Sequence, residues 1–226
     1  LQNYQINITK YIDGNYIEKC HVKRRFTKKL MKKCLGSTTQ KNAPIGYLIG
    51  DSHARNYLMA ARKLLPSFDI KYMTMGHGCA FLPSSMISDK LDKYVSCTQY
   101  SKSVASLIAK ESRRGDIVFI GQALHGNLHD KRAIQEYFDH INIFTNTLAH
   151  KSIPVVIFDG TFPPGLPNLC MKEVWRPFPN CETNINEARS TYKRFDELAV
   201  SLSNSSENIY YAPLRLGLCV KETCGQ

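Results

Sequence analysis

The sequence predicts a three-layer αβα sandwich built around a mostly parallel five-stranded sheet. The first observation is a regular alternation of short apolar runs with helix-period segments from residue 45 to residue 211. The second is the composition, since 43% hydrophobic and 22% charged residues in a chain of 226 are ordinary globular values. That composition excludes a disordered, collagen-like or coiled-coil chain, and no apolar run approaches the roughly 18 residues of a membrane span.

Each element of this sandwich has its own pattern. The five expected strands are Ile45–Gly50, Asp69–Met75, Ile117–Gly121, Ile153–Phe158 and Asn208–Tyr211. The four expected helices are His53–Leu65, Ser101–Arg113, Lys131–His150 and Asn184–Ser201. The third helix is the clearest, because its large apolar residues recur every three or four positions. These residues are expected to form core and nothing more.

The net charge of +11 is concentrated near the start of the chain. Ten of the 30 Lys and Arg residues lie within residues 1–41, against two acidic residues. We therefore expect a basic N-terminal extension over residues 1–41 and the α/β domain over residues 42–226. The densest part of the extension holds Lys23, Arg24, Arg25, Lys28, Lys29, Lys32 and Lys33. This cluster could contact anionic lipid or polysaccharide, or form only a solvated helix face, and no nucleic-acid module accompanies it.

The eight cysteines fall into four neighbouring pairs along the chain. Because short loops close most readily, we expect four disulfides: Cys20–Cys34, Cys79–Cys97, Cys170–Cys181 and Cys219–Cys224. Eight cysteines allow many other connectivities. Disulfides place the chain in an oxidising compartment, the periplasm or the extracellular space. The alternative is a cytosolic protein with buried thiols or a zinc site, but the sequence contains no Cys-x2-Cys pair.

The chemistry is expected at the tetrapeptide Gly50-Asp51-Ser52-His53. It follows the first predicted strand, and ligands of open parallel sheets bind outside the carboxyl ends of the strands. A serine at this point can act as a nucleophile, because nearby amides can hold the oxyanion that forms on attack. The alternative is simple helix capping, for which Asp and Ser are both preferred residues.

This tetrapeptide resembles block I of the SGNH (GDSL-like) hydrolases. The wider pattern over about residues 44–226 resembles the SGNH domain fused to acyltransferase-three membrane proteins. It comprises Tyr47–Arg55, Gly76–Cys79, Asp116–Val118, the Pro-rich stretch ending in Cys170, and Leu218–Cys219 followed by Cys224. The resemblance implies an SGNH/flavodoxin-like sheet. It also implies an extracytoplasmic O-acyltransferase that passes an acyl group, expected to be acetyl, through a serine ester to a sugar hydroxyl of lipopolysaccharide, peptidoglycan or another envelope glycan. The acyl donor would be a membrane-embedded acyltransferase domain to which the chain is tethered.

The resemblance also implies roles for individual residues. Ser52 would be the nucleophile, and its N–H would be the first oxyanion donor, with Asp51 and His53 in support. Gly78 would be the second donor, with Gly76 as the fallback, and Asn127 would be the third. No cofactor and no metal are expected. His125 and His129 have i, i+4 spacing, but two histidines without a third ligand do not make a metal site.

The family's Asp-x-x-His motif, whose histidine takes the serine proton, does not occur in these 226 residues. We therefore expect a missing C-terminal catalytic tail and poor activity of the chain as it stands, and we expect an N-terminal portion to precede Leu1. Two other functions remain open at this point. One is a carbohydrate acetylesterase, with water as the acceptor, and the other is a non-catalytic glycan-binding relative.

Overall fold

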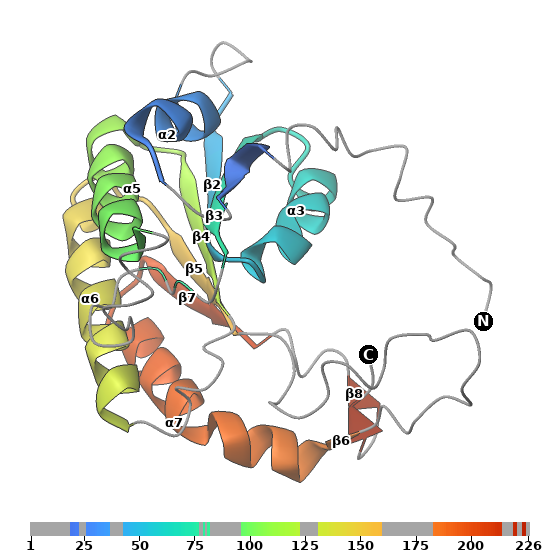
Figure 1. The fold of residues 1–226 in the computed structure, drawn as a ribbon. Coiled ribbons are helices and arrows are strands. Elements are labelled where there is room, and N and C mark those ends of the chain that lie inside the picture. Colours follow the sequence, from blue (N-terminus) through green and yellow to red (C-terminus); the bar gives the residue numbers. More distant parts are fainter. Residues whose placement is uncertain are drawn as a thin grey trace, which may run out of the picture.

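The computed structural model describes residues 19–22, 26–36, 43–76, 79, 81, 96–122, 131–159, 183–213, 219–220 and 223–224. Its main sheet has six parallel strands in the spatial order β1-β3-β2-β4-β5-β7 (Figure 1). The strands are β1 (His21–Val22), β2 (Ile45–Asp51), β3 (Asp69–Met75), β4 (Ile117–Gly121), β5 (Val155–Phe158) and β7 (Ile209–Ala212). The predicted parallel α/β fold is confirmed, with one strand more than expected.

The helices form the outer layers of the sandwich. They are α2 (Lys28–Leu35), the 3-10 helix η2 (Ala54–Tyr57), α3 (Leu58–Leu64), α5 (Cys97–Glu111), α6 (Lys131–Ala149) and α7 (Ile185–Asn204). Figure 1 shows α5, α6 and α7 on one side of the sheet and α3 on the other. The helix expected over His53–Leu65 is thus divided into η2 and α3, because the chain first completes a turn after β2.

Three short strands form a second, antiparallel sheet in the order β6-β9-β8. They are β6 (Thr183–Asn184), β8 (Cys219–Val220) and β9 (Thr223–Cys224). In the described ranges, no helix combines the length and the hydropathy that crossing a bilayer requires.

The described part of the basic segment packs onto the α/β domain and adds a strand to its sheet. Strand β1 pairs with the end of β3, with His21 opposite Thr74 and Val22 opposite Met75. Val22, Phe26 and Leu35 are buried, and the Phe26 ring packs edge-on against Tyr100 of α5 at 5.9 Å. The apolar residues between the lysines are therefore core residues, which is why the segment folds onto the sheet.

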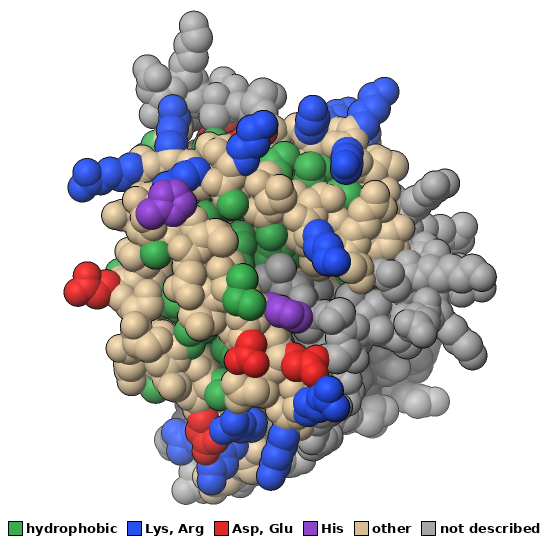
Figure 2. Space-filling model, turned by 90° about the vertical axis from the view of Figure 1, so that its left-hand side faces the viewer, with side chains coloured by type: hydrophobic (Ala, Val, Ile, Leu, Met, Phe, Trp, Pro, Cys, Tyr) green, Lys and Arg blue, Asp and Glu red, His purple; other side chains and the backbone are tan. Residues whose placement is uncertain are grey.

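The lysines of this segment lie on the outer side of α2. Lys28, Lys29, Lys32 and Lys33 are exposed, whereas Met31 faces inward. In Figure 2, Lys and Arg side chains gather at the upper end of the molecule, the end at which Figure 1 places α2. Lys23, Arg24 and Arg25 lie outside the described residues. The described part of the expected cluster is therefore accessible to a partner.

Two of the four expected disulfides are present. Cys20–Cys34 joins the residue before β1 to α2, and Cys79–Cys97 joins the segment after β3 to the start of α5. Cys219 and Cys224 are opposite one another in the β8–β9 register, but their side chains are not described, and Cys170 and Cys181 lie outside the described residues. Both observed cross-links attach segments at the carboxyl end of the sheet to the helices beside it.

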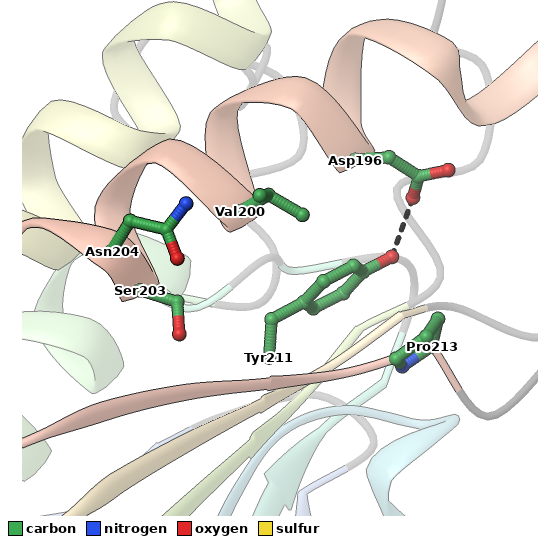
Figure 3. A pocket seen from close by; sticks show the side chains of 6 residues that line it. All are labelled: Asp196, Val200, Ser203, Asn204, Tyr211 and Pro213. Atoms are coloured by element: carbon green, nitrogen blue, oxygen red, sulfur yellow. Dashed lines mark hydrogen bonds between the residues drawn. The ribbon is translucent and has the colours of Figure 1, made fainter.

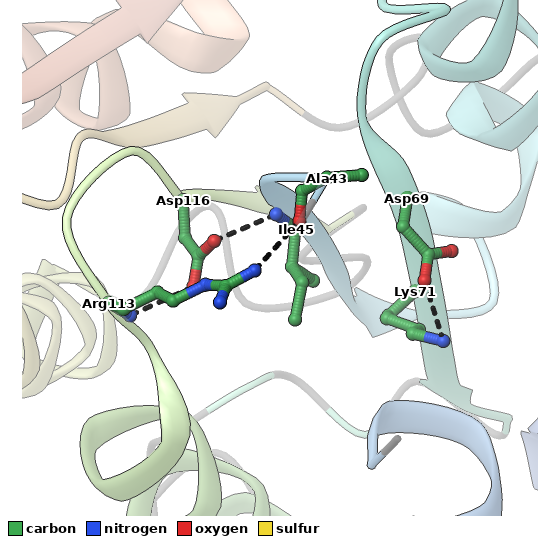
Figure 4. Close-up of polar contacts among 6 residues, drawn as sticks. All are labelled: Ala43, Ile45, Asp69, Lys71, Arg113 and Asp116. Atoms are coloured by element: carbon green, nitrogen blue, oxygen red, sulfur yellow. Dashed lines mark hydrogen bonds and ion pairs between the residues drawn. The ribbon is translucent and has the colours of Figure 1, made fainter. Parts of the chain in front are cut away.

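A buried carboxylate fixes the amino end of the sheet (Figure 4). Asp116 precedes β4 and is 1% exposed; its carboxylate accepts the Ile45 N–H at 2.7 Å and the Arg113 N–H at 2.9 Å. The Arg113 guanidinium in turn donates to the Ala43 carbonyl at 3.0 Å. The start of β2 is thereby held to the turn before β4.

Replacing Asp116 with alanine is expected to destabilise the domain by about 3 kcal/mol, because two backbone N–H groups would lose a charged acceptor. The measurement is urea unfolding of the oxidised protein. Asp139→Ala is the control: this exposed carboxylate accepts a hydrogen bond from the Gln135 amide on the same helix, and its loss should shift stability by less than about 0.5 kcal/mol. Equal effects of the two substitutions would contradict the assignment.

Candidate active site

The order of the strands brings the Ser52 turn to the centre of the sheet. The chain runs from β2 to its neighbour β3 and then crosses to β4 on the other side of β2. Such a reversal leaves a crevice at the carboxyl ends of the two strands, where open α/β sheets bind their ligands. Asp51 ends β2, and Gln122 directly follows β4. Ser52, the next residue after β2, therefore lies at the switch point.

The Asp51 side chain holds the turn that contains Ser52. This residue is 2% exposed, and its carboxylate accepts the His53 N–H at 2.8 Å. That hydrogen bond closes an Asx-type turn around Ser52, which is itself half-buried. Asp51 thus fixes the backbone of the turn that carries Ser52.

Two glycines allow the chain to turn at this point. Gly50 has φ +140°, and a Cβ on it would lie 1.8 Å from the Gly121 carbonyl oxygen. A Cβ on Gly121 would lie 3.0 Å from the Ala54 side chain. Strands β2 and β4 and the 3-10 helix therefore meet more closely than larger residues would permit, which sets where Ser52 emerges.

Tyr100 of α5 fixes the end of β2 from the helical side. Its hydroxyl group donates toward the Met73 and Gly50 carbonyls at 2.9 and 3.0 Å and accepts the Gly50 N–H at 3.3 Å. Burial raises the pKa of Tyr100 well above its usual value, so the hydroxyl keeps its proton. Tyr100 was not singled out from the sequence, because its contacts are more than 20 positions away along the chain.

The first residue after β3, Gly76, is hydrogen-bonded to the edge strand β1. The Gly76 N–H donates to the Val22 carbonyl at 2.8 Å. Gly76 is therefore wrong as a fallback oxyanion donor, because its N–H is already engaged. Gly78, the first choice, lies outside the described residues. The segment is next fixed at Cys79, whose disulfide joins it to α5.

Gln122 anchors the same segment further along, and sequence reasoning missed it. The Gln122 amide is 1% exposed; it accepts the Phe81 N–H at 2.8 Å and donates to the Phe81 carbonyl at 3.5 Å. The amide nitrogen also bonds the Tyr137 hydroxyl. Asn127, the residue proposed from the sequence in this region, lies outside the described residues. The available signal was a polar residue directly after a buried strand at the switch point.

None of the histidines in the described ranges hydrogen-bonds to Ser52. His53 is half-buried, and burial lowers its pKa, which favours the neutral imidazole. His21, on β1, shares a hydrogen bond with Thr74 at 2.9 Å. His77, His125 and His129 lie outside the described residues. The described residues thus include Ser52 and the groups that hold its turn, Asp51 among them.

A serine at the switch point of a parallel sheet, behind a glycine that closes the turn, defines an α/β protein with a strand-end serine site. The chain belongs to the family described as SGNH domain (fused to AT3 domains), which matches residues 19–226. The resemblance noted at Gly50-Asp51-Ser52-His53 is confirmed. The family match begins before β1, in agreement with the incorporation of that strand into the sheet.

A solved structure supports the fold. The periplasmic domain of the lipopolysaccharide acetyltransferase of Salmonella ser. Paratyphi A superposes with a TM-score of 0.62 at 16% sequence identity, over 97% of this chain and 82% of that one. No curated protein sequence matches this chain.

Proposed function

We propose that this chain is the extracytoplasmic domain of an O-acetyltransferase that passes an acetyl group through an ester on Ser52 to a sugar hydroxyl of a cell-envelope polysaccharide. The observation that carries the proposal is the placement of Ser52 directly after β2, at the switch point, in a domain of the family fused to AT3 domains. The acetyltransferase named among solved structures supports the choice of acyl group and acceptor.

The reaction consists of two matched acyl transfers. In the first, Ser52 Oγ attacks the acetyl carbonyl carbon, its proton passes to a general base, and the donor group leaves with a proton from the conjugate acid. In the second, a sugar hydroxyl attacks the Ser52 ester and gives its proton to the base. The Ser52 oxygen then leaves, recovering a proton. The net change moves one acetyl group, and no oxidant or cofactor is consumed.

Both tetrahedral intermediates carry a negative oxygen that needs preorganised donors. We assign these donors to the Ser52 N–H, the Gly78 N–H and the Asn127 side chain. Gln122 acts through another group: it holds both backbone polar groups of Phe81, three residues beyond Gly78 in the sequence. It is a positioning residue.

The test is acetyl transfer from p-nitrophenyl acetate to a soluble sugar acceptor. The proposal expects an O-acetylated sugar that depends on Ser52. Acetate as the sole product, with the acceptor present at saturation, would instead identify a carbohydrate esterase. Absence of any Ser52-dependent acetyl product, together with no labelling by a fluorophosphonate, would identify a non-catalytic glycan-binding relative.

Gln122→Ala is expected to lower kcat about tenfold with KM nearly unchanged. A misplaced oxyanion donor weakens the transition state more than the ground state, and a complete loss of such a donor costs about 10²- to 10³-fold. The measurement is the steady-state kinetics of acetyl-ester cleavage. Gln135→Ala is the control, since that amide bonds an exposed carboxylate on α6. A rise in KM alone would overturn the positioning role.

We further propose that the domain works in the periplasm, tethered to a membrane-embedded acyltransferase domain that supplies the acetyl group. The exposed lysines of α2 support contact with anionic lipid or polysaccharide, since charge this dense attracts anionic partners. Binding to vesicles containing phosphatidylglycerol should weaken as salt is raised. Binding that is insensitive to salt would show that the lysines of α2 only face solvent and bind no anionic partner.

The general base is assigned to an Asp-x-x-His motif, which these 226 residues do not contain. By itself the chain should therefore turn over acetyl esters slowly, and a longer form of the protein carrying that motif should be faster by about 10⁴-fold. Equal Ser52-dependent rates in both forms would place the base within residues 1–226.

A further inference from the structure

A small pocket lies between α7 and the edge strand β7 (Figure 3). Its volume is about 370 Å³, and it is lined by Asp196, Val200, Ser203, Asn204, Tyr211 and Pro213. This volume is at the lower end of the range of small-molecule sites. The first four lining residues come from α7, Tyr211 lies on β7, and Pro213 follows the strand. None of these residues belongs to the Ser52 site.

The floor of the pocket is preorganised. The Tyr211 hydroxyl donates to the Asp196 carboxylate at 2.5 Å, and the Tyr211 ring packs on Phe195 with centroids 6.0 Å apart. The Ser203 hydroxyl donates to the Ile209 carbonyl at 2.8 Å. A ligand would therefore meet side chains that are already ordered, which reduces the entropy lost on binding.

The chemistry of the lining resembles that of a surface for a polyhydroxylated ring. An aromatic ring with Val200 and Pro213 offers apolar contact for C–H groups. A carboxylate accepts hydrogen bonds from hydroxyl groups, and the Asn204 amide can both donate and accept. The negative charge of the Asp196 carboxylate would repel an anionic ligand in the same pocket. We propose that this pocket binds a neutral sugar unit of the acceptor polysaccharide.

The pocket runs along β7 and reaches the carboxyl-terminal rim of the sheet at Pro213, whereas Ser203 and Asn204 lie beside the start of the strand. Gly50, Gly121, Phe158 and Ala212 are register partners on successive strands, so the end of β7 lies three strand positions from the end of β2. At about 4.8 Å per strand, this is about 14 Å along the rim. One polymeric acceptor can therefore occupy the pocket while another of its sugars is at Ser52. In this respect the inference rests on the proposed function.

The experiment titrates the ¹⁵N-labelled Ser52→Ala protein with galactose, mannose, rhamnose, N-acetylglucosamine and, as the anionic probe, glucuronate. At least one neutral sugar should shift the amides of residues 200–204 and 209–212, and glucuronate should bind at least tenfold more weakly. Val200→Trp, which fills the pocket from an exposed position, should weaken binding at least tenfold. Ile143→Trp places the same side chain on an exposed position of α6 and should leave binding unchanged.

A kinetic readout complements the titration. Asn204→Ala in the protein that retains Ser52 should raise KM for a polysaccharide acceptor about three- to tenfold, because one hydrogen bond to the acceptor is lost. The kcat and the KM for a monosaccharide acceptor should not change.

Each other outcome overturns the inference. These outcomes are no shifts with any sugar, shifts away from the pocket, an unaffected Val200→Trp variant, or shifts that follow protein concentration, which would assign the β7 edge to a second copy of the chain. Because binding is measured without transfer, pocket binding in a protein that forms no Ser52 ester would refute only the proposed function. Ester formation without pocket binding would refute only the inference.

Discussion

Ser52→Ala is expected to remove all covalent labelling by a fluorophosphonate and to abolish the slow acetyl-ester turnover of the chain. The reason is that both half-reactions of the proposed mechanism pass through an ester on Ser52 Oγ, and the neighbouring Asp51 carboxylate is occupied by the His53 N–H. The measurement is intact-protein mass spectrometry, which should find one adduct on the unmodified chain and none on the variant.

Ser190→Ala is the matched control for this experiment, because Ser190 is an exposed serine of α7. It should keep the single adduct. An adduct that persists in Ser52→Ala at the same stoichiometry would place the nucleophile elsewhere.

Gly50→Ala should destabilise the domain by about 3 kcal/mol or more. The new methyl group would lie 1.8 Å from the Gly121 carbonyl oxygen, and it would be forced onto a backbone with φ +140°, where only glycine is free of strain. Strands β2 and β4 would have to separate at the switch point. We expect both the midpoint of urea unfolding and the labelling of Ser52 to fall.

Gly115→Ala separates the two causes. Gly115 has φ +98°, but a Cβ there would meet nothing within 4 Å, so this variant carries only the backbone strain, about 1 to 2 kcal/mol. A loss for Gly50→Ala no greater than that for Gly115→Ala would show that the close approach of β2 and β4 contributes nothing.

The central strands β2 and β4 could be predicted because each is a short apolar run buried along nearly its whole length. The observed bounds of β3 and β4 agree with the expected ones. Strand β1 could not be predicted, because two residues carry no periodicity and its pairing with Thr74 spans about 50 positions of sequence. The many basic residues around β1 also gave the segment a polar composition, which did not indicate that Val22 and Phe26 are buried.

The site was predictable to a similar extent. Position after the first strand was enough to place Ser52 and Asp51 at the carboxyl end of β2, where the structure has them. Gln122 and Tyr100 were missed because their roles depend on long-range hydrogen bonds to the backbone of Phe81 and Gly50, which no local pattern encodes. The same reason explains the failed choice of Gly76, whose N–H is taken by a residue of β1.

The two observed cross-links have a consequence for when the site takes its final form. Cys20–Cys34 secures the strand that holds Gly76, and Cys79–Cys97 secures the chain just beyond it. Since such bonds form outside the reducing cytosol, a newly made chain gains these two constraints only after export. We therefore expect the segment around Gly76 and Cys79 to be fully fixed only in the exported protein.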